Sequence, residues 1–376
     1  MAVPEHHNLG KVIVTGGSGG FASQVLKLLP QWGSAALHSL DIREPATYLD
    51  GVTYHIADLT DKVSMRRILD EVKPDVVVHT ASPRFDSPRE VLFKVNVGGT
   101  RTLVQAAKDA GAKCFVYTSS ASVISDAMTD LIGADETYPL IVGERQPEYY
   151  THTKALAESY VLSQNRASDA PEFLTCAIRP SGIFGVGDLV TLPLMLDSLD
   201  KGATKFQLGS NQNLHDFTEN TNVAYAHYLA AAALLRQHAN ASVLCSEEKV
   251  DGEAFIITND EPRHFWDFVR TVWRYAGDQT RPDQIWTIQR PTALMIAGAL
   301  EWVFWALRLG DPPLTRLKVR LSCMTRRFCI DKAKERLGYK PLVRLDEGLR
   351  VGVEDCLKRR LLEKDNGAEG QKQKSH

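Results

Sequence analysis

The sequence predicts an α/β protein with a doubly wound parallel sheet, followed by a smaller C-terminal α/β lobe. Two observations predict this fold. Short apolar, β-branched runs alternate with helical patterns through the first half of the chain, and the first run leads directly into a glycine-rich turn. The length agrees, because 376 residues with 44% hydrophobic content can form a large core and a second lobe.

The first predicted element is the apolar run 11–15, which has the pattern of a buried parallel strand. It leads into a turn that contains Gly16 and Gly19, and then into a helical pattern over residues 23–29. Gly16 permits a tight turn, and Gly19 lets the backbone approach a pyrophosphate at the helix N-terminus. Strand, turn and helix together indicate a Rossmann-type dinucleotide-binding unit.

A second apolar run ends at Asp41, about 20 residues beyond the turn. An acid at this position binds the 2′-hydroxyl of an adenosine ribose, which favours NAD as the cofactor. Arg43 could accept a 2′-phosphate, so NADP remains the less favoured alternative.

The alternation of strands and helices continues and indicates βαβ units in a parallel sheet. Ligands of such sheets bind beyond the carboxyl ends of the strands, where we expect Asp58, Ala81, Ser120 and Pro180. His79 lies inside a strand and is expected to be a hydrogen-bonded core residue. The predicted helices are 63–72, 91–110 and 148–162, and the predicted strands are 75–80, 113–120 and 174–179.

Tyr150 and Lys154 stand four residues apart, on one face of a predicted helix. A nearby ammonium group and an oxidised nicotinamide would lower the tyrosine pKa, which is ordinarily near 10. The hydroxyl of Ser120 could hold a substrate oxygen in line with the phenol. This set of groups is suited to taking the proton of an alcohol while a hydride leaves its carbon.

Composition excludes several function classes. A net charge of −2 gives no general attraction to nucleic acid. The six cysteines show neither Cys-x-x-Cys spacing nor a metal-ligand pattern, so we expect no metal site and a reducing compartment. We also expect no cleaved signal sequence at the N-terminus.

We divide the chain into three parts. Residues 1–185 are predicted to form the NAD-binding domain, to which elements around 215–260 return. Residues 186–362 are expected to form the substrate-binding lobe. The tail, 363–376, is rich in Lys, Gln, Gly and Glu and is predicted to be disordered.

The predicted lobe contains an apolar helix at 292–309, with Trp302 and Trp305 one turn apart. Residues 308–344 hold eleven Lys or Arg against three Asp or Glu, a net charge of +8. One interpretation is a helix that lies in a membrane interface. The other is a helix buried under the lobe, whereas Glu301 argues against a complete span.

Together these motifs resemble the extended short-chain dehydrogenases, and within them the 3β-hydroxysteroid dehydrogenase family. The branch most similar in pattern comprises the decarboxylating sterol-4α-carboxylate 3-dehydrogenases of fungi and animals. This family has a large apolar residue where Gly20 stands and a glycine where Ala22 stands, which indicates a divergent branch. The matching segments are 15–19, Asp41, 57–59, 79–83, 94–100, 117–121, 150–154, 179–185, 222–227, 252–259, 312–315 and 337–341.

The resemblance implies that Tyr150 is the catalytic acid/base, tuned by Lys154, and that Ser120 binds the reacting oxygen. Lys154 would also hold the nicotinamide ribose. The dinucleotide would be held by Gly16, Gly19, Asp41 and Asp58, with Ala81 and Pro180 against it.

The implied reaction is NAD-dependent oxidation of a sterol 3β-hydroxyl, followed by loss of a 4α-carboxylate as CO₂. The implied location is the cytoplasm or the cytoplasmic face of the endoplasmic reticulum membrane, with a homodimer as the expected assembly. Oxidation of another steroid or terpenoid alcohol, a nucleotide-sugar epimerase or dehydratase, and a non-enzymatic NAD sensor remain as alternatives.

Overall fold

The computed structural model describes residues 6–240 and 248–373. Its centre is a seven-stranded sheet in the order β12-β7-β5-β4-β1-β2-β3, and every strand pair in it is parallel. The predicted doubly wound sheet is confirmed. The strands are β1 (His7–Thr15), β2 (Gly33–Asp41), β3 (Val52–Ile56), β4 (Val76–His79), β5 (Cys114–Thr118), β7 (Leu174–Pro180) and β12 (Glu253–Ile257).

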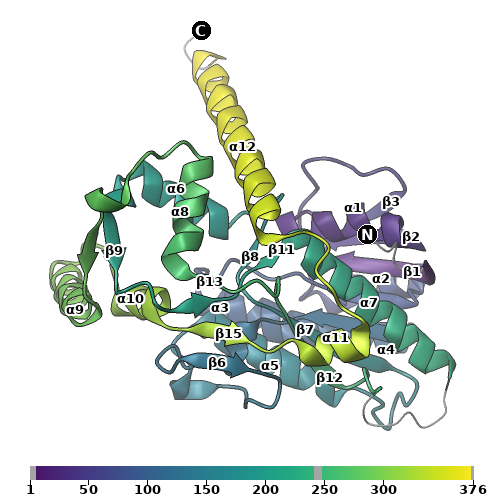
Figure 1. The fold of residues 1–376 in the computed structure, drawn as a ribbon. Coiled ribbons are helices and arrows are strands. Elements are labelled where there is room, and N and C mark those ends of the chain that lie inside the picture. The colour runs from purple at the N-terminus through teal and green to yellow at the C-terminus, as the bar shows by residue number, and fades with distance from the viewer. Residues whose placement is uncertain (1–5, 241–247, 374–376) are drawn as a thin grey trace.

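Helices cover both faces of this sheet (Figure 1). On one face α1 packs against α7, and their apolar side chains share a core with β1. On the other face α4 packs against α2 and α5 over a second apolar core. The bounds of these helices are α1 (Gly20–Trp32), α2 (Lys62–Val72), α4 (Thr100–Asp109), α5 (Tyr149–Ser163) and α7 (Asn220–Ala239).

The helix predicted over 91–110 is present but not uniform. It begins as α3 (Arg89–Leu92), continues as the π-helical segment η1 (Phe93–Gly99) and ends as α4. A π-helical turn holds one more residue than an α-helical turn and is frequent at functional sites. In this chain η1 contains the buried residue Asn96.

The second lobe lies beyond the carboxyl edge of the main sheet, on the left of Figure 1. It contains a four-stranded sheet in the order β13-β10-β15-β6 and a two-stranded sheet β14-β9. Its elements are β6 (Leu131–Ala134), β9 (Phe206–Leu208), β10 (Leu214–His215), β13 (Arg263–His264), β14 (Trp286–Ile288), β15 (Arg326–Phe328), α6 (Thr191–Asp200), α8 (Phe265–Tyr275), α9 (Arg290–Leu307) and α10 (Arg316–Cys323).

Several segments pass between the two lobes. β6 comes from the first half of the chain but pairs with β15 in the second lobe. Conversely, α7 and β12 come from later in the chain but belong to the first lobe, where α7 packs on α1 and β12 pairs with β7 in the main sheet. The remaining short elements are β8 (Ile183–Phe184), β11 (Thr218–Glu219), α11 (Asp331–Leu337) and the 3₁₀ turns η2 (Ala121–Ile124), η3 (Gly143–Arg145), η4 (Ala203–Lys205) and η5 (Pro282–Gln284).

The described part of the chain ends in a long helix. The last helix, α12 (Leu345–Gln373), extends through most of the segment that was expected to be disordered, and it projects from the body in Figure 1. Leu345, Leu349 and Val353 anchor its first part in the core of the lobe.

The apolar helix predicted at 292–309 is α9, at the outer edge of the lobe in Figure 1. Ala293 and Ala297 pack with Val319 of α10, so only a narrow face of small residues is buried. Trp302 is 66% exposed and Trp305 is 76% exposed. These exposed fractions disagree with the interpretation of a helix buried under the lobe. In the described parts of the chain, no helix is long and apolar enough to cross a membrane.

Candidate active site

The glycine-rich turn connects β1 to α1. Gly16 has φ of 76°, and a Cβ on it would lie 2.9 Å from the Ala81 Cα, so only glycine fits between β1 and β4. The Gly19 amide donates to the Gly16 carbonyl at 2.8 Å and closes the turn. Because no side chain caps α1 and its first turn holds no acid, its N-terminal amides can donate hydrogen bonds to a phosphate.

Gly20, which departs from the family pattern, has a local explanation. A Cβ on Gly20 would lie 1.8 Å from the Gly187 carbonyl oxygen. The loop after β8 therefore approaches the start of α1 too closely for any side chain.

Asp41 ends β2 beside the turn. One carboxylate oxygen accepts from the Ser18 amide at 3.0 Å, and the other accepts from the Arg43 amide at 3.0 Å. The carboxylate thus holds the turn and faces the carboxyl edge of the sheet. The Ser18 hydroxyl donates to the backbone carbonyl of Arg43 at 2.7 Å.

The other predicted cofactor residues follow neighbouring strands along the same edge. Asp58 comes two residues after β3 and accepts from the Thr60 amide and hydroxyl at 2.8 Å each. Ala81 follows β4, and its amide donates to the Thr15 hydroxyl at 3.2 Å. Pro180 is the buried last residue of β7.

Ser120 and Tyr150 belong to two elements that meet at this edge. Ser120 follows β5 and caps the 3₁₀ turn η2, where its hydroxyl accepts from the Ser122 amide at 3.1 Å. Tyr150 is the second residue of α5 and is half-buried. Both side chains thus lie where the edge of the main sheet meets the second lobe.

Lys154 lies one turn after Tyr150 in α5 and is only 2% exposed. Its ammonium donates to the Thr118 carbonyl and stands 4.5 Å from the centre of the Tyr117 ring. Burial lowers the pKa of Lys154 to about 7, although the carboxylate of Glu158 acts in the opposite direction. The ammonium is therefore anchored to the end of β5.

The pKa of Tyr150 is raised in the protein alone, whereas the predicted lowering involves both Lys154 and a bound oxidised nicotinamide. Burial is the main cause of the rise, and the negative charge of Glu148 adds to it. A hydrogen bond with Ser82 acts in the opposite direction and favours the phenolate. Ser82 is thus the group of this chain that assists ionisation of Tyr150.

Ser82 belongs to a hydrogen-bonded network that the sequence analysis did not identify. Its hydroxyl donates to Asn96 Oδ1 at 2.9 Å, and Asn96 Nδ2 donates to the Thr153 hydroxyl at 3.0 Å. The Thr153 hydroxyl then donates to the Tyr150 carbonyl at 2.7 Å. The network thus connects the π-helical segment η1 to the first turn of α5. In the sequence, an asparagine close to two glycines within a helical pattern was the feature that could have pointed to this network.

His79 is a core residue, as predicted. Its ring nitrogens bond to the hydroxyls of Thr15 at 2.7 Å and Thr100 at 2.9 Å, and burial lowers its pKa to about 3. His227 of α7, also buried, bonds to the Thr118 hydroxyl at 2.7 Å. Both histidines are neutral at physiological pH and serve to fix β1, β5 and their neighbours.

A surface cavity of about 1080 Å³ lies between α2 and α4, away from Ser120 and Lys154. Tyr149 lines this cavity, whereas its neighbour Tyr150 contacts Ser82. Successive helix residues point about 100° apart, so only one of the two tyrosines belongs to the candidate site.

Two further observations concern metals and thiols. Within residues 6–240 and 248–373, no group of three or more His, Cys, Asp or Glu side chains is arranged to hold a metal ion. Five cysteines in those ranges are free thiols, and Cys245 lies outside the described residues.

Comparison with known proteins gives relatives that match most of the chain. The sequence profile of the 3-beta hydroxysteroid dehydrogenase/isomerase family matches residues 13–288. A Schizosaccharomyces pombe protein named sterol-4-alpha-carboxylate 3-dehydrogenase, decarboxylating, is 38% identical over 338 residues, which cover 89% of this chain and 94% of the relative. A human protein named for the same activity is 32% identical over 342 residues, which cover 91% and 87% of the two chains.

Solved structures agree on the fold. UDP-glucose 4-epimerase of Thermotoga maritima superposes with a TM-score of 0.66 at 19% identity, and the match covers 93% of this chain and 99% of the epimerase. The dTDP-glucose 4,6-dehydratase of Streptomyces venezuelae gives a TM-score of 0.67 at 19% identity, with 93% and 97% of the two chains covered. At this identity the likeness shows the fold alone.

Proposed function

The chain belongs to the 3-beta hydroxysteroid dehydrogenase/isomerase family, and from this premise we propose that it oxidises the 3β-hydroxyl of a 4α-carboxysterol. The 3-keto acid that forms then loses CO₂. The main support is identity of 38% to a relative named for this reaction, over nearly the whole of both chains. The candidate groups Ser120, Tyr150 and Lys154 supply the acid/base chemistry that the oxidation requires.

The proposed cofactor is NAD⁺, which would accept the hydride from the alcohol carbon. The residues fit this group, because the turn at Gly16 admits no side chain, α1 offers uncapped amides, and Asp41 is placed for a ribose hydroxyl. Asp58, Ala81 and Pro180 would lie along the same edge. The carboxylate of Asp41 would repel a 2′-phosphate, which disfavours NADP.

The role of Tyr150 in this proposal is to take the proton of the 3β-hydroxyl while Ser120 holds the oxygen. Ser82 supports the phenolate, since its single hydroxyl hydrogen can turn from Asn96 to the Tyr150 oxygen when the phenol loses its proton. The ammonium of Lys154 provides a positive charge at the end of β5 and would hold the nicotinamide ribose. Loss of CO₂ then needs no further group, because its electron pair is delocalised onto the new carbonyl as an enolate.

The direct test is an assay of purified protein with a 4α-carboxysterol. We expect reduced cofactor and CO₂ in equal amounts with NAD⁺, and a much lower rate with NADP⁺. Replacing Tyr150 by Phe should lower kcat by about 10²- to 10⁴-fold and leave NADH binding unchanged in a fluorescence titration. Oxidation without CO₂ release would favour another steroid alcohol as substrate, and full activity of Tyr150→Phe would reject the mechanism.

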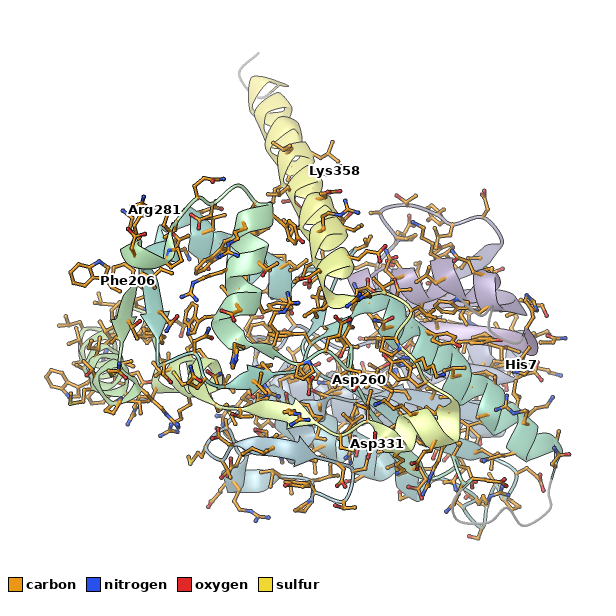
Figure 2. The ribbon with its side chains drawn as sticks, viewed as in Figure 1. His7, Phe206, Asp260, Arg281, Asp331 and Lys358 are labelled. Atoms are coloured by element: carbon orange, nitrogen blue, oxygen red, sulfur yellow. The ribbon has the colours of Figure 1, made fainter. Side chains whose placement is uncertain are left out.

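We also propose that residues 186–362 form the substrate lobe and contact a membrane through α9. Beside the exposed tryptophans of α9, the β14-β9 pair exposes Trp286 by 73% and Phe206 by 50%. Figure 2 shows Phe206 at the outer side of the lobe, at the opposite end of the molecule from His7. An exposed apolar surface of this kind favours binding at a lipid interface, from which a sterol can enter the site.

The proposed location is accordingly the cytoplasmic face of the endoplasmic reticulum membrane, or the cytoplasm with reversible membrane contact. Arg308 ends α9, Lys318 and Arg320 lie in the next helix, α10, and these cations would attract anionic headgroups. A homodimer remains a prediction from the fold, and gel filtration of the purified protein tests it.

A further inference from the structure

The loop 185–190 connects β8 to α6 and lies against the first residue of α1. The carbonyl oxygen of Gly187 is so close to Gly20 that no side chain fits on Gly20, and Leu189 also lies beside it. Gly20 begins the helix whose uncapped amides form the proposed site of the cofactor pyrophosphate. The loop is therefore in backbone contact with the end of the helix that would bind the phosphates.

Two side chains of α12 hold the middle of this loop. The Gly187 amide donates to Asp355 Oδ2 at 2.9 Å, and Arg359 Nη2 donates to the Asp188 carbonyl at 2.7 Å. Arg359 Nε also donates to Asp355 Oδ2 at 3.0 Å. Asp355 and Arg359 thus form one ion pair that bonds to the backbone of two adjacent loop residues.

The part of α12 that carries this ion pair is itself fixed. Leu345, Leu349 and Val353 are buried in the apolar core of the second lobe. A Cβ on Gly352 would lie 2.9 Å from the Gly185 Cα, so the helix and the loop pack backbone to backbone. In Figure 1 the start of α12 lies at the junction of the two lobes. Contacts thus run without interruption from α12 through the loop to α1.

The loop would lose its order without these contacts. Gly185 has φ of 127° and Gly187 has φ of 77°, and glycine has access to many other backbone conformations. A loop that is ordered before a ligand binds spares the ligand the entropy of ordering it. Release of the loop from α12 should therefore weaken binding at the N-terminus of α1.

We propose that Asp355 is a positioning residue for the cofactor, which together with Arg359 holds the loop 185–190 against α1 and so raises the affinity for the dinucleotide pyrophosphate. This inference rests on the proposed function, because it takes the N-terminus of α1 as the site of the pyrophosphate. Asp355 acts through the loop and takes no part in the transfer of hydride or proton.

The test measures Kd for two ligands, NADH by fluorescence titration and ADP-ribose by calorimetry. ADP-ribose contains the pyrophosphate and lacks the nicotinamide, so a role at the pyrophosphate affects both ligands. Asp355→Leu should raise both Kd values by a similar factor of about 5- to 20-fold. Asp355→Asn keeps an oxygen that can accept from the Gly187 amide, and its Kd values should stay within about 3-fold of the wild type.

Glu354→Leu is the matched control. This neighbouring acid bonds to Arg350 on the exposed side of α12 and should leave both Kd values unchanged when replaced. Arg359→Met is a second variant, which removes the bond to the Asp188 carbonyl and leaves Asp355 in place. It should raise both Kd values by about 3- to 10-fold, and it provides the test if Asp355→Leu does not fold.

The outcomes separate this inference from the proposed function. If the wild-type protein binds neither ligand, the proposed cofactor site fails. If it binds both, and folded Asp355→Leu binds both as tightly or loses affinity for NADH alone, the cofactor site stands and the role of Asp355 is rejected. An equal loss of affinity in Asp355→Asn would reject the bond to the loop as the cause.

Discussion

Replacing Lys154 by Met should stabilise the protein alone while abolishing its proposed activity. Burial lowers the pKa of Lys154 from its ordinary 10.5 to about 7, and each pKa unit corresponds to about 1.4 kcal/mol. At pH 7 the depressed pKa of Lys154 therefore costs about 4 kcal/mol of the free energy of unfolding. Met has a similar length and no charge, so the variant avoids that cost.

Part of this gain is offset. The variant leaves the Thr118 carbonyl without its ammonium donor and removes the contact with the Tyr117 ring, which together are worth about 1–2 kcal/mol. The expected net gain is about 2–3 kcal/mol. An unfolding entropy of about 2.1 cal/mol/K per residue gives about 0.8 kcal/mol/K for this chain, so Tm should rise by about 3 °C.

The pH dependence provides a sharper assay. Between pH 7 and 10.5 the unfolded chain keeps the Lys154 proton that the folded chain has released, so wild-type stability gains a contribution that rises with pH. One proton contributes about 1.4 kcal/mol per pH unit. Denaturant unfolding at several pH values should show this rise in the wild-type protein and a shallower one in Lys154→Met. A variant that is less stable at pH 7, or that keeps the full rise, refutes the reasoning.

Three other predictions concern the catalytic tyrosine, the choice of cofactor and the membrane contact. Ser82→Ala should shift the acidic limb of the kcat/KM profile for oxidation, where the rate rises as Tyr150 loses its proton, to higher pH, because it removes the hydroxyl that lowers the Tyr150 pKa; an unshifted limb would contradict this role. Asp41→Asn should reduce the preference for NAD⁺ over NADP⁺ by about 10- to 100-fold in steady-state assays, since it removes the charge that repels a 2′-phosphate. The double variant Trp302→Ser/Trp305→Ser should weaken flotation with vesicles of phosphatidylcholine and phosphatidylserine, whereas Tyr48→Ser, 59% exposed on the nucleotide-binding half, should float like the wild type.

Local sequence patterns were enough to predict five of the seven strands of the main sheet, all but β3 and β12. The run 11–15, the turn at Gly16 and the helix after it are specified by neighbouring residues, and they form β1, the turn and α1 as expected. The positions of Asp41 and Ser120 followed as well, because the carboxyl ends of parallel strands meet at one edge.

Other features depend on partners far along the chain. The π-helical segment places Asn96 against Thr153, a contact between residues 57 positions apart that no local periodicity encodes. Lys154 has the expected spacing from Tyr150, yet its ammonium bonds to Thr118, because the end of β5 lies under α5.

The pairing of β6 with β15 has a consequence for how the protein is made. A ribosome that has finished Ala134 must add 192 further residues before Arg326 exists. At about 5–20 residues per second this interval lasts roughly 10 to 40 s, during which the nascent chain presents an unpaired strand edge. A chain that terminates early could assemble much of its main sheet and still lack the partner strand of β6 in the second lobe.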